Sequence, residues 1–312
     1  MTYTPKPYVE AFVTDLTTNQ NKTASTVKMY KYDIESFISW YENQNSDLPF
    51  SEWLKLNEED FLQYFGYLTT ENSSQANLKR IASSLNSMLR FYEQDIYLVP
   101  TKKSQRPLED IDFLTDVEIK RLLNPKKYCN LSSLQSEMYE YLGERNLSIL
   151  LLMIKHGLTV NDIYNLSIED VNFTQSEIRV YSKDNYRLIK LRKKEKQILL
   201  SYYESIPDLF RPALYSSHPL FLPFNPQSLT FYYDYDKAEP KRLSIRGIQK
   251  VIMTECKRAN LKRIVSSTQL RNTAILLAIK AGLKNKDLQY MFGMKTPHAL
   301  LRYKRHLKEQ PN

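Results

Sequence analysis

The stretch Ser267–Leu307, STQLRNTAILLAIKAGLKNKDLQYMFGMKTPHALLRYKRHL, decides how the rest of the chain is interpreted. Within it, the apolar run NTAILLAIKAG predicts a buried helix that stops near Gly282. A basic run, RYKRH, then surrounds Tyr303. The final 52 residues hold 11 Lys and Arg but only two Asp and Glu. Positive charge gathered in this way is typical of proteins that bind a polyanion, most often nucleic acid.

The charge is uneven along the whole chain. Residues 1–106 carry 11 Lys and Arg against 13 Asp and Glu, a net charge of −2. Residues 107–312 carry 33 against 22, a net charge of +11. Two interpretations of this charge stay open at this point, a surface that binds a polyanion and an ordinary solvated basic surface.

Composition excludes several classes of protein. A chain of 312 residues is long enough for two domains with their own cores. Its apolar runs are shorter than the roughly 18 residues of a membrane span, and its start does not resemble a signal peptide, so a cytoplasmic location is expected. Cys129 and Cys256 are the only cysteines, and the four histidines lack metal-ligand spacing, so no structural metal is expected. The six glycines are scattered, which argues against a nucleotide cofactor or any other phosphate-loop ligand.

The first 99 residues predict a small helical bundle. Apolar residues recur at helical spacing, and Ser25 is expected to cap the second helix. The predicted helices span about 9–16, 26–41, 59–68 and 75–92. The polar face of the last helix presents Lys79, Arg80 and Arg90. Four amphipathic helices of this length are typical of a bundle.

Residues 100–110 are expected to link two domains. In this segment Pro100 and Pro107 bracket Lys102, Lys103 and Arg106, and the apolar period is lost. Prolines and polar residues without a period indicate a linker. A basic linker is also suited to lie along a DNA backbone.

Residues 111–312 predict a second domain, mainly helical with a small β-sheet. Thr115 and Glu118 form a capping box before a helix. The run LSILLLMIKHG predicts a buried helix that stops at Gly157. The segment SEIRVYSKDNYRLIKL has two strand-like runs around a turn at Lys183, which predicts a hairpin. The run LSIRGIQKVIMTECKRANL predicts another helix.

Five segments of this domain stand in the order found in one known family. They are LTDVEIKRLL, GLTVNDIYNLSIEDVNF, the hairpin around Lys183, TQLRNTAILLAIKAG, and DLQYMFGM followed by LLRYKRH. Over nearly its full length the chain resembles the tyrosine recombinase/integrase (phage integrase) family. The resemblance implies an N-terminal helical core-binding (SAM-like) bundle and a C-terminal tyrosine-recombinase catalytic-type domain. In this family the two domains close around duplex DNA as a C-shaped clamp.

The resemblance also implies a chemistry. A tyrosine hydroxyl attacks a DNA phosphodiester, two arginines bind the developing negative charge, and a lysine protonates the leaving oxygen. Carried over by position, Tyr303 stands at the nucleophile, Arg271 at the second arginine and Lys183 at the hairpin lysine. A phenol with an ordinary pKa near 10 needs such partners to attack.

Other positions depart from the family pattern. The first arginine is replaced by Thr159, the histidine three residues before the second arginine by Thr268, and the residue after Phe-Gly by Met294. Asn272 stands where a histidine commonly follows the second arginine. Since removing one preorganised donor lowers a rate by about 10²–10³, these losses predict weak or vestigial catalysis.

The sequence therefore predicts a double-stranded DNA-binding protein on a tyrosine-recombinase fold, inactive in strand cleavage and acting as a regulator (repressor) of a phage or mobile element. The alternative is an active recombinase or integrase that uses Tyr303. The expected partner is duplex DNA, with no membrane and no nucleotide cofactor; self-association on DNA stays open, and the location is the bacterial cytoplasm at the nucleoid. The expected DNA contacts are Lys79, Arg80, Arg90, Lys102, Lys103, Arg106, Lys183, Arg271 and Arg302.

Overall fold

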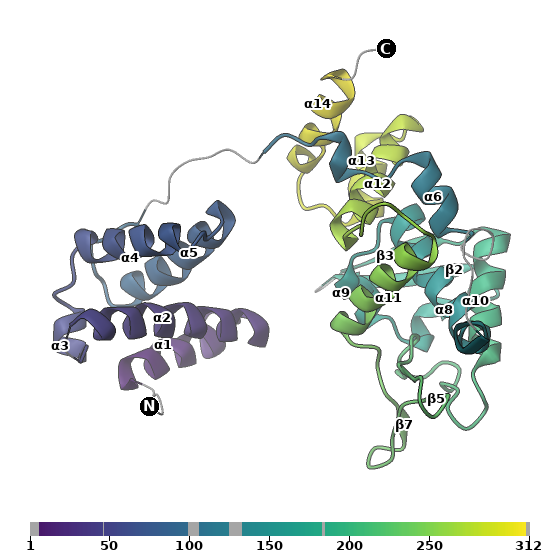
Figure 1. The fold of residues 1–312 in the computed structure, drawn as a ribbon, viewed down its shortest axis with the longest axis horizontal. Coiled ribbons are helices and arrows are strands. Elements are labelled where there is room, and N and C mark those ends of the chain that lie inside the picture. The colour runs from purple at the N-terminus through teal and green to yellow at the C-terminus, as the bar shows by residue number, and fades with distance from the viewer. Residues whose placement is uncertain (1–5, 46, 99–105, 125–132, 183–184, 310–312) are drawn as a thin grey trace. The chain divides into compact units, whose positions relative to one another are not determined.

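The computed structural model describes residues 6–45, 47–98, 106–124, 133–182 and 185–309, with the backbone alone for residues 133–137. The chain divides into two compact units, Met1–Arg106 and Pro107–Asn312. Helices form most of both units, and short strands occur in the second (Figure 1). The predicted fold class, mainly α with a small sheet, is confirmed.

The first unit is a helical bundle. Its helices are α1 (Pro7–Thr18), α2 (Ala24–Gln44), α3 (Phe50–Trp53), α4 (Glu58–Thr70) and α5 (Gln75–Phe91). The side chain of Thr23 caps α2, so the predicted cap at Ser25 is wrong, because the helix begins two residues earlier than its apolar period suggests. Asn57 and Asp60 form a capping box at α4, and Ser74 caps α5.

Aromatic and aliphatic side chains fill the centre of this unit. Phe12, Phe37, Trp53 and Phe61 are fully buried, and the rings of Phe37 and Phe61 stack with centroids 4.8 Å apart. Each large apolar side chain removed from water contributes about 1.5–3 kcal/mol. The apolar stripes therefore face inward, which leaves the polar face of α5 at the surface.

The second unit carries the longer series of elements. In chain order they are η1 (Asp110–Asp112), α6 (Asp116–Leu122), α8 (Ser133–His156), α9 (Val160–Asn165), η2 (Ile168–Asp170), β1 (Val171–Asn172), β2 (Glu177–Ser182), β3 (Asn185–Lys190), α10 (Lys193–Ser205), β4 (Phe224–Asn225), β5 (Thr230–Phe231), β6 (Tyr233–Asp234), β7 (Glu239–Pro240), α11 (Ile245–Arg258), α12 (Ser267–Lys280), α13 (Asn285–Phe292), η3 (Pro297–Leu300) and α14 (Leu301–Glu309). The capping box at Thr115 is confirmed. The pairs β4–β5 and β6–β7 were not predicted, since strands of two residues show no alternation.

The predicted hairpin is confirmed by the antiparallel pairing of β2 with β3, which adjoin β1 in a three-stranded sheet. The register places Ser182 opposite Asn185, and residues 183–184 between them lie outside the described part of the chain. Along β3 the inward positions are Arg187 and Ile189, which are both buried. An arginine at an inward strand position is unusual, because burial of a charge requires a compensating partner.

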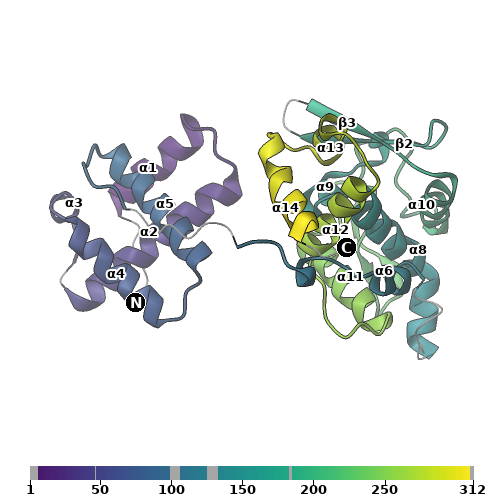
Figure 2. The same ribbon diagram turned by 90° about the horizontal axis from the view of Figure 1, so that it is seen from above.

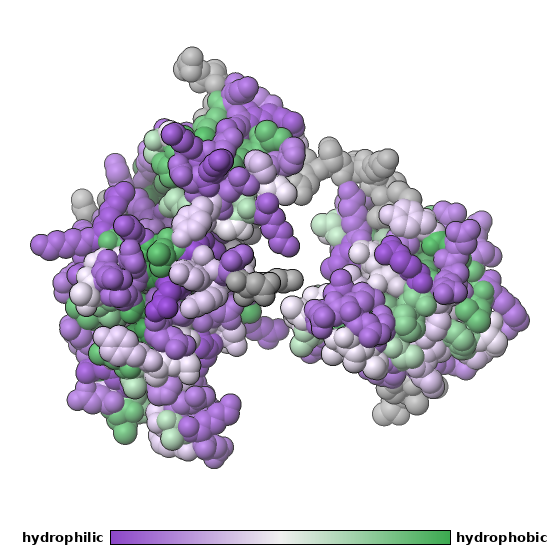
Figure 3. All heavy atoms as spheres, turned by 180° about the vertical axis from the view of Figure 1, so that it is seen from behind, coloured by the Kyte–Doolittle hydropathy of each residue, from purple (hydrophilic) through white to green (hydrophobic). Residues whose placement is uncertain are grey.

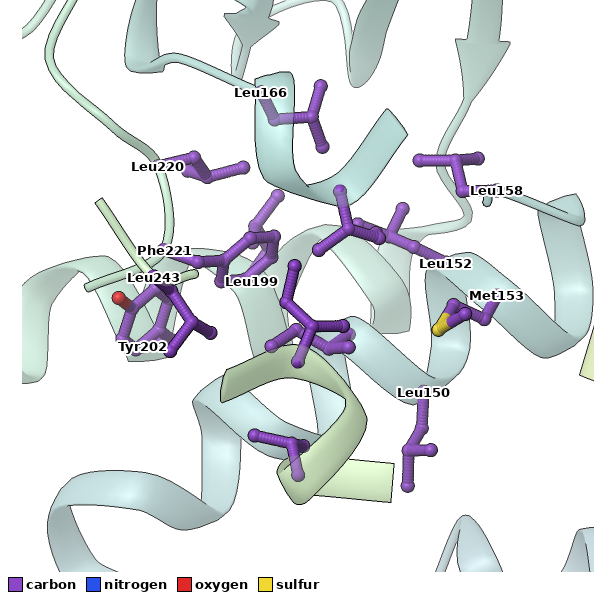
Figure 4. Packing of buried hydrophobic residues seen from close by; sticks show 14 of the residues in the cluster. Leu150, Leu152, Met153, Leu158, Leu166, Leu199, Tyr202, Leu220, Phe221 and Leu243 are labelled. Carbon is purple, nitrogen blue, oxygen red and sulfur yellow. The ribbon is translucent and has the colours of Figure 1, made fainter. Parts of the chain in front are cut away.

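The core of the second unit forms around α8. Figure 4 shows Leu150, Leu152 and Met153 of this helix among apolar side chains from other segments, including Leu199 and Tyr202 of α10. The helix ends at Gly157, as predicted, with a φ of +65°. This left-handed turn directs the chain into α9.

A second apolar cluster joins the beginning of this unit to its end. Leu108 and Phe113 pack with residues of α12, α13 and α14, which gather at one side of the unit (Figures 1 and 2). The ring of Phe113 stacks on His306 with centroids 4.6 Å apart, and the Nδ1 of His306 lies 3.0 Å from the carbonyl of Leu108. Leu108, within the segment treated above as a linker, is therefore part of the packing that holds α14.

On the face shown in Figure 3 both units are mostly hydrophilic, with smaller hydrophobic patches. The helices of the described ranges are all too short or too polar to cross a lipid bilayer. In the same ranges no group of three or more His, Cys, Asp or Glu side chains is arranged to hold a metal ion.

Candidate nucleic-acid interface

Arg271 lies where three distant segments of the second unit meet. It stands in the second turn of α12, donates from Nη1 to the carbonyl of Gly157 at the end of α8, and donates from Nη2 to the carbonyl of Phe292 at the end of α13. Burial lowers the pKa of Arg271, Asp162 opposes this change, and the positive charge of Arg187 adds to it. The guanidinium is thus fixed in a pocket that contains further charged groups.

Two glycines make this close meeting of segments possible. A Cβ at Gly157 would lie 2.4 Å from the ring of Phe292, and a Cβ at Gly293 would lie 2.9 Å from Nη1 of Arg187. Both glycines also have positive φ values, +65° and +57°. L-residues avoid that conformation, so the backbone favours glycine at both positions, and at Gly157 the ring of Phe292 also leaves no room for a side chain.

Tyr303 is buried beside Arg271 rather than exposed on α14. Its side chain is 6% exposed, and its hydroxyl donates to Oδ1 of Asn272 over 2.8 Å. Burial raises the pKa of the Tyr303 phenol, and the positive charges of Arg302 and Arg271 oppose that rise. The phenol is therefore neutral near pH 7, with its proton directed at an amide oxygen.

The three replaced positions lie in different environments. Thr159 caps α9: its Oγ1 accepts from the amide of Asp162, and its own amide donates to Oδ2 of Asp162. Thr268 is exposed one turn before Arg271 on α12. Met294 is partly buried against the cluster that contains Tyr303. Thr159 and Met294 each follow by two residues a carbonyl that binds Arg271, so both positions lie near its guanidinium.

Arg187 is a member of this pocket that sequence reasoning missed. It is 6% exposed, and its Nη2 donates to Oδ2 of Asp162 over 3.0 Å. The signal was present in the sequence, because alternation along NYRLIK places Arg187 on the same face as Ile189. An inward arginine in a strand indicates either a buried ion pair or a binding site.

In the first unit, a shallow depression of about 300 Å³ brings basic residues together. Lys22, Lys79 and Arg90 line it, with Ser83 and Asn86 between them on α5. The α5 residues recur at intervals of three and four, so they lie on one helix face. A depression lined by cations and by hydroxyl and amide groups has the chemistry of a surface that binds phosphate and base edges.

Residues 112–310 match the phage integrase family. The chain belongs to this family. The tyrosine recombinase XerD of Staphylococcus saprophyticus is 23% identical over 295 residues, which cover 91% of this chain and 89% of the relative. A tyrosine recombinase of Thermosipho africanus is 25% identical over 296 residues, with coverage of 91% and 90%.

Solved structures share the fold. XerH recombinase bound to its difH substrate before cleavage aligns with a TM-score of 0.62 at 14% identity, over 96% of this chain and 83% of that chain. A λ integrase dimer bound to a COC′ core site aligns with a TM-score of 0.62 at 14% identity, over 98% of this chain and 78% of that chain. The helical N-terminal unit and the C-terminal unit are therefore those of the phage integrase fold.

The other expected DNA contacts of this phage integrase family member have different surroundings. Arg80 is bonded through Nη1 to Asp33 and through Nη2 to Asn77, so its guanidinium fastens α5 to α2. Arg106 is exposed, and Arg302 is partly buried with its guanidinium 6.0 Å from the centroid of the Tyr303 ring. Lys102, Lys103 and Lys183 lie outside the described residues.

Proposed function

We propose that this chain binds double-stranded DNA and holds it without cutting it, as a regulator of a phage or another mobile element. The observation that carries the proposal is the buried hydroxyl of Tyr303, which donates to the amide oxygen of Asn272, a residue that stands where the family commonly has a histidine. A cytoplasmic location at the nucleoid belongs to the same proposal.

The chemistry of Asn272 argues against attack by Tyr303. A phenol must lose its proton to attack phosphorus, and an amide oxygen is too weak a base to accept that proton. Burial also raises the pKa of Tyr303, which further disfavours the phenolate. Bond formation at phosphorus would therefore need a base that the described pocket does not place at this hydroxyl.

The replaced catalytic groups also argue against strand cleavage. Removing one preorganised donor to a developing oxyanion lowers a rate by about 10²–10³. Thr159 offers at most one neutral hydrogen bond where a charged arginine fork is expected, and Met294 offers none. These effects are not additive, but each weakens cleavage more than it weakens binding.

Duplex binding is supported by charge and by the structural neighbours. Residues 107–312 carry a net charge of +11, and the α5 face of the first unit adds Lys79 and Arg90. The structural neighbours include recombinases solved on duplex substrates. In this proposal basic residues of both units contact the duplex, and copies associate on adjacent sites.

An active recombinase is the second candidate. The observation that favours it is the presence of Tyr303 and Arg271 in one pocket, where the charge of Arg271 opposes the raised pKa of the phenol. The curated relatives XerD and XerC are named tyrosine recombinases. The two candidates agree on DNA binding and differ only in whether a covalent bond forms.

Binding is expected to depend on the α5 face and on salt. On genomic duplexes that the protein itself enriches, log affinity should fall with log salt at about −0.9 per phosphate contact. Reversing both Lys79 and Arg90 to glutamate should weaken binding about tenfold or more and flatten the slope by about 2. Fluorescence anisotropy measured at salt concentrations from about 50 to about 300 mM gives both the affinity and its slope with salt.

The matched control is Lys55→Glu. Lys55 is exposed, pairs with Glu52 and does not line the depression. This variant should leave the slope unchanged. A slope shallower than about −2 for the unaltered protein would contradict an interface that contacts many phosphates. Equal loss in the control would remove the α5 face from the interface.

No covalent adduct is expected on a nicked suicide substrate. The enriched duplex carries a nick beside each candidate phosphate, so that cleavage releases a short strand and traps any phosphotyrosyl bond. Denaturing electrophoresis of the protein should show the same single band as Tyr303→Phe, and both proteins should bind the uncut duplex with affinities that differ by at most one hydrogen bond, about 0.5–1.5 kcal/mol. A denaturant-stable adduct formed by the unaltered protein and absent in Tyr303→Phe would establish the second candidate instead.

A further inference from the structure

The carboxylate of Asp162 holds Arg187 beside position 159. Its Oδ2 accepts from the backbone amide of Thr159 over 2.7 Å and from Nη2 of Arg187 over 3.0 Å. The side chains of Arg187 and Asp162 are 7% and 15% exposed, so the ion pair is largely removed from water. Arg187 thus lies next to the position where the resemblance expects the first active-site arginine.

Arg187 also meets the segment that binds Arg271. A Cβ at Gly293 would lie 2.9 Å from Nη1 of Arg187, while the carbonyl of the preceding Phe292 accepts from Nη2 of Arg271. Two adjacent residues at the end of α13 therefore touch both guanidinium groups. Two like charges at such a place repel each other unless an anion lies between them.

The hydrogen bonds of Arg187 are incomplete within the described residues. Arginine has five N–H donors, the bond to Asp162 uses Nη2, and the buried Nε has no partner there. Buried polar groups almost always have a partner, so this donor calls for a bound water or a ligand. Two guanidinium groups and one carboxylate leave one positive charge, which a phosphodiester neutralises.

We propose that Arg187 and Arg271 together bind one phosphodiester of the DNA backbone, so that Arg187 supplies the guanidinium that position 159 lacks. The inference rests on the proposed DNA binding and names the groups that bind one phosphate. This phosphate is bound whether or not the strand is cleaved. If Arg187 served only to pair with Asp162, its replacement would change stability but not the recognition of any particular phosphate.

The direct test couples one side chain to one phosphate. Neutral methylphosphonates are placed one at a time through the footprint on the enriched duplex, and affinity is measured for the unaltered protein and for Arg187→Gln. One substitution should weaken the unaltered protein about tenfold to a hundredfold, as expected for lost charged hydrogen bonds. Arg187→Gln should bind unmodified DNA more weakly by a similar factor. The methylphosphonate at that position should not weaken the binding of this variant any further. Arg271→Gln should couple to the same phosphate.

The controls separate recognition from folding. Arg179→Gln removes an exposed arginine from the adjacent strand β2 and should couple to no single phosphate. Arg187→Gln leaves the carboxylate of Asp162 without its counter-charge. Asp162→Asn combined with Arg187→Gln therefore provides a neutral pair, whose fold is checked by circular dichroism. The proposal would be overturned if, in either Arg187 variant, the loss of affinity from the substitution simply added to the loss from each methylphosphonate at every position.

A second experiment uses no DNA, so it tests the paired-arginine site even if the protein does not bind a duplex. Inorganic phosphate, compared with chloride at equal ionic strength, should raise the unfolding temperature of the unaltered protein and of Arg179→Gln. The neutral pair at positions 162 and 187 should lose that rise. No rise in the unaltered protein, or an equal rise in the neutral pair, counts against the paired-arginine site. A rise without any duplex binding would instead refute the proposed function alone.

Discussion

Replacing Arg80 by alanine is expected to lower the free energy of unfolding of the first unit by about 3 kcal/mol, the lower part of the range for breaking a buried ion pair. Asp33 is 1% exposed and accepts from Arg80 and from Ser84. Removal of the guanidinium leaves this carboxylate buried without its counter-charge. The lower part of the range applies because the Arg80 side chain is 34% exposed and water reaches the pair. Urea unfolding followed by circular dichroism measures the change.

The control is Arg90→Ala, which removes an exposed arginine from the last turn of the same helix. It should lower stability by at most about 1 kcal/mol through the helix dipole, while weakening DNA binding. Replacing Asp33 and Arg80 together by apolar residues should restore part of the lost stability, because no buried charge then remains. If Arg80→Ala unfolds at the same urea concentration as the unaltered protein, the ion pair is not what fastens α5 to α2.

Replacing Gly157 by alanine is expected to destabilise the second unit by about 2–5 kcal/mol. The left-handed conformation at φ +65° costs an L-residue about 1–2 kcal/mol. The added Cβ would also lie 2.4 Å from the ring of Phe292, and overpacking of this kind costs about 1–3 kcal/mol. Thermal unfolding of the full chain measures the loss. The carbonyl of residue 157 binds Arg271, so DNA affinity should fall as well.

Gly282→Ala separates backbone strain from overpacking as causes of the lost stability. Gly282 has a φ of +78°, but no atom lies within 4 Å of a Cβ added there. This variant should therefore show the backbone strain alone, about 1–2 kcal/mol, with DNA affinity unchanged. Equal destabilisation in the two variants would mean that Phe292 moves away freely, and that the close approach at Gly157 does not hold the pocket together.

Of the two arginine positions that the resemblance assigns to phosphate binding, this phage integrase family member keeps Arg271 and has Thr159 at the other, and the positions assigned to proton transfer are changed as well. Arg271 remains bound between two carbonyls, and Arg187 adds a second guanidinium nearby. Asn272, Thr268 and Met294 occupy positions where the resemblance expects groups that exchange protons or donate to the reacting phosphate. Binding and cleavage make different demands on a site, and this difference underlies the proposal of a regulator.

The sequence by itself determined the family and several of the elements. The apolar period of residues 75–92 predicted α5, the alternation around Lys183 predicted β2 and β3, and the order of five segments predicted the family fold. These features depend on local spacing, which fixes which side chains share a face. Position alone also singled out Arg271 and Tyr303 among many arginines and tyrosines.

Only the tertiary structure decided what each charged side chain does. Arg80 and Arg90 lie on the same helix, yet Arg80 pairs with Asp33 on another helix while Arg90 lines an open depression. Arg187 and Arg271 are 84 positions apart in the sequence, and they come near each other because both lie at the end of α13. The strength of a charge pair depends on its distance and burial, which are set by how helices and strands pack and not by spacing along the chain.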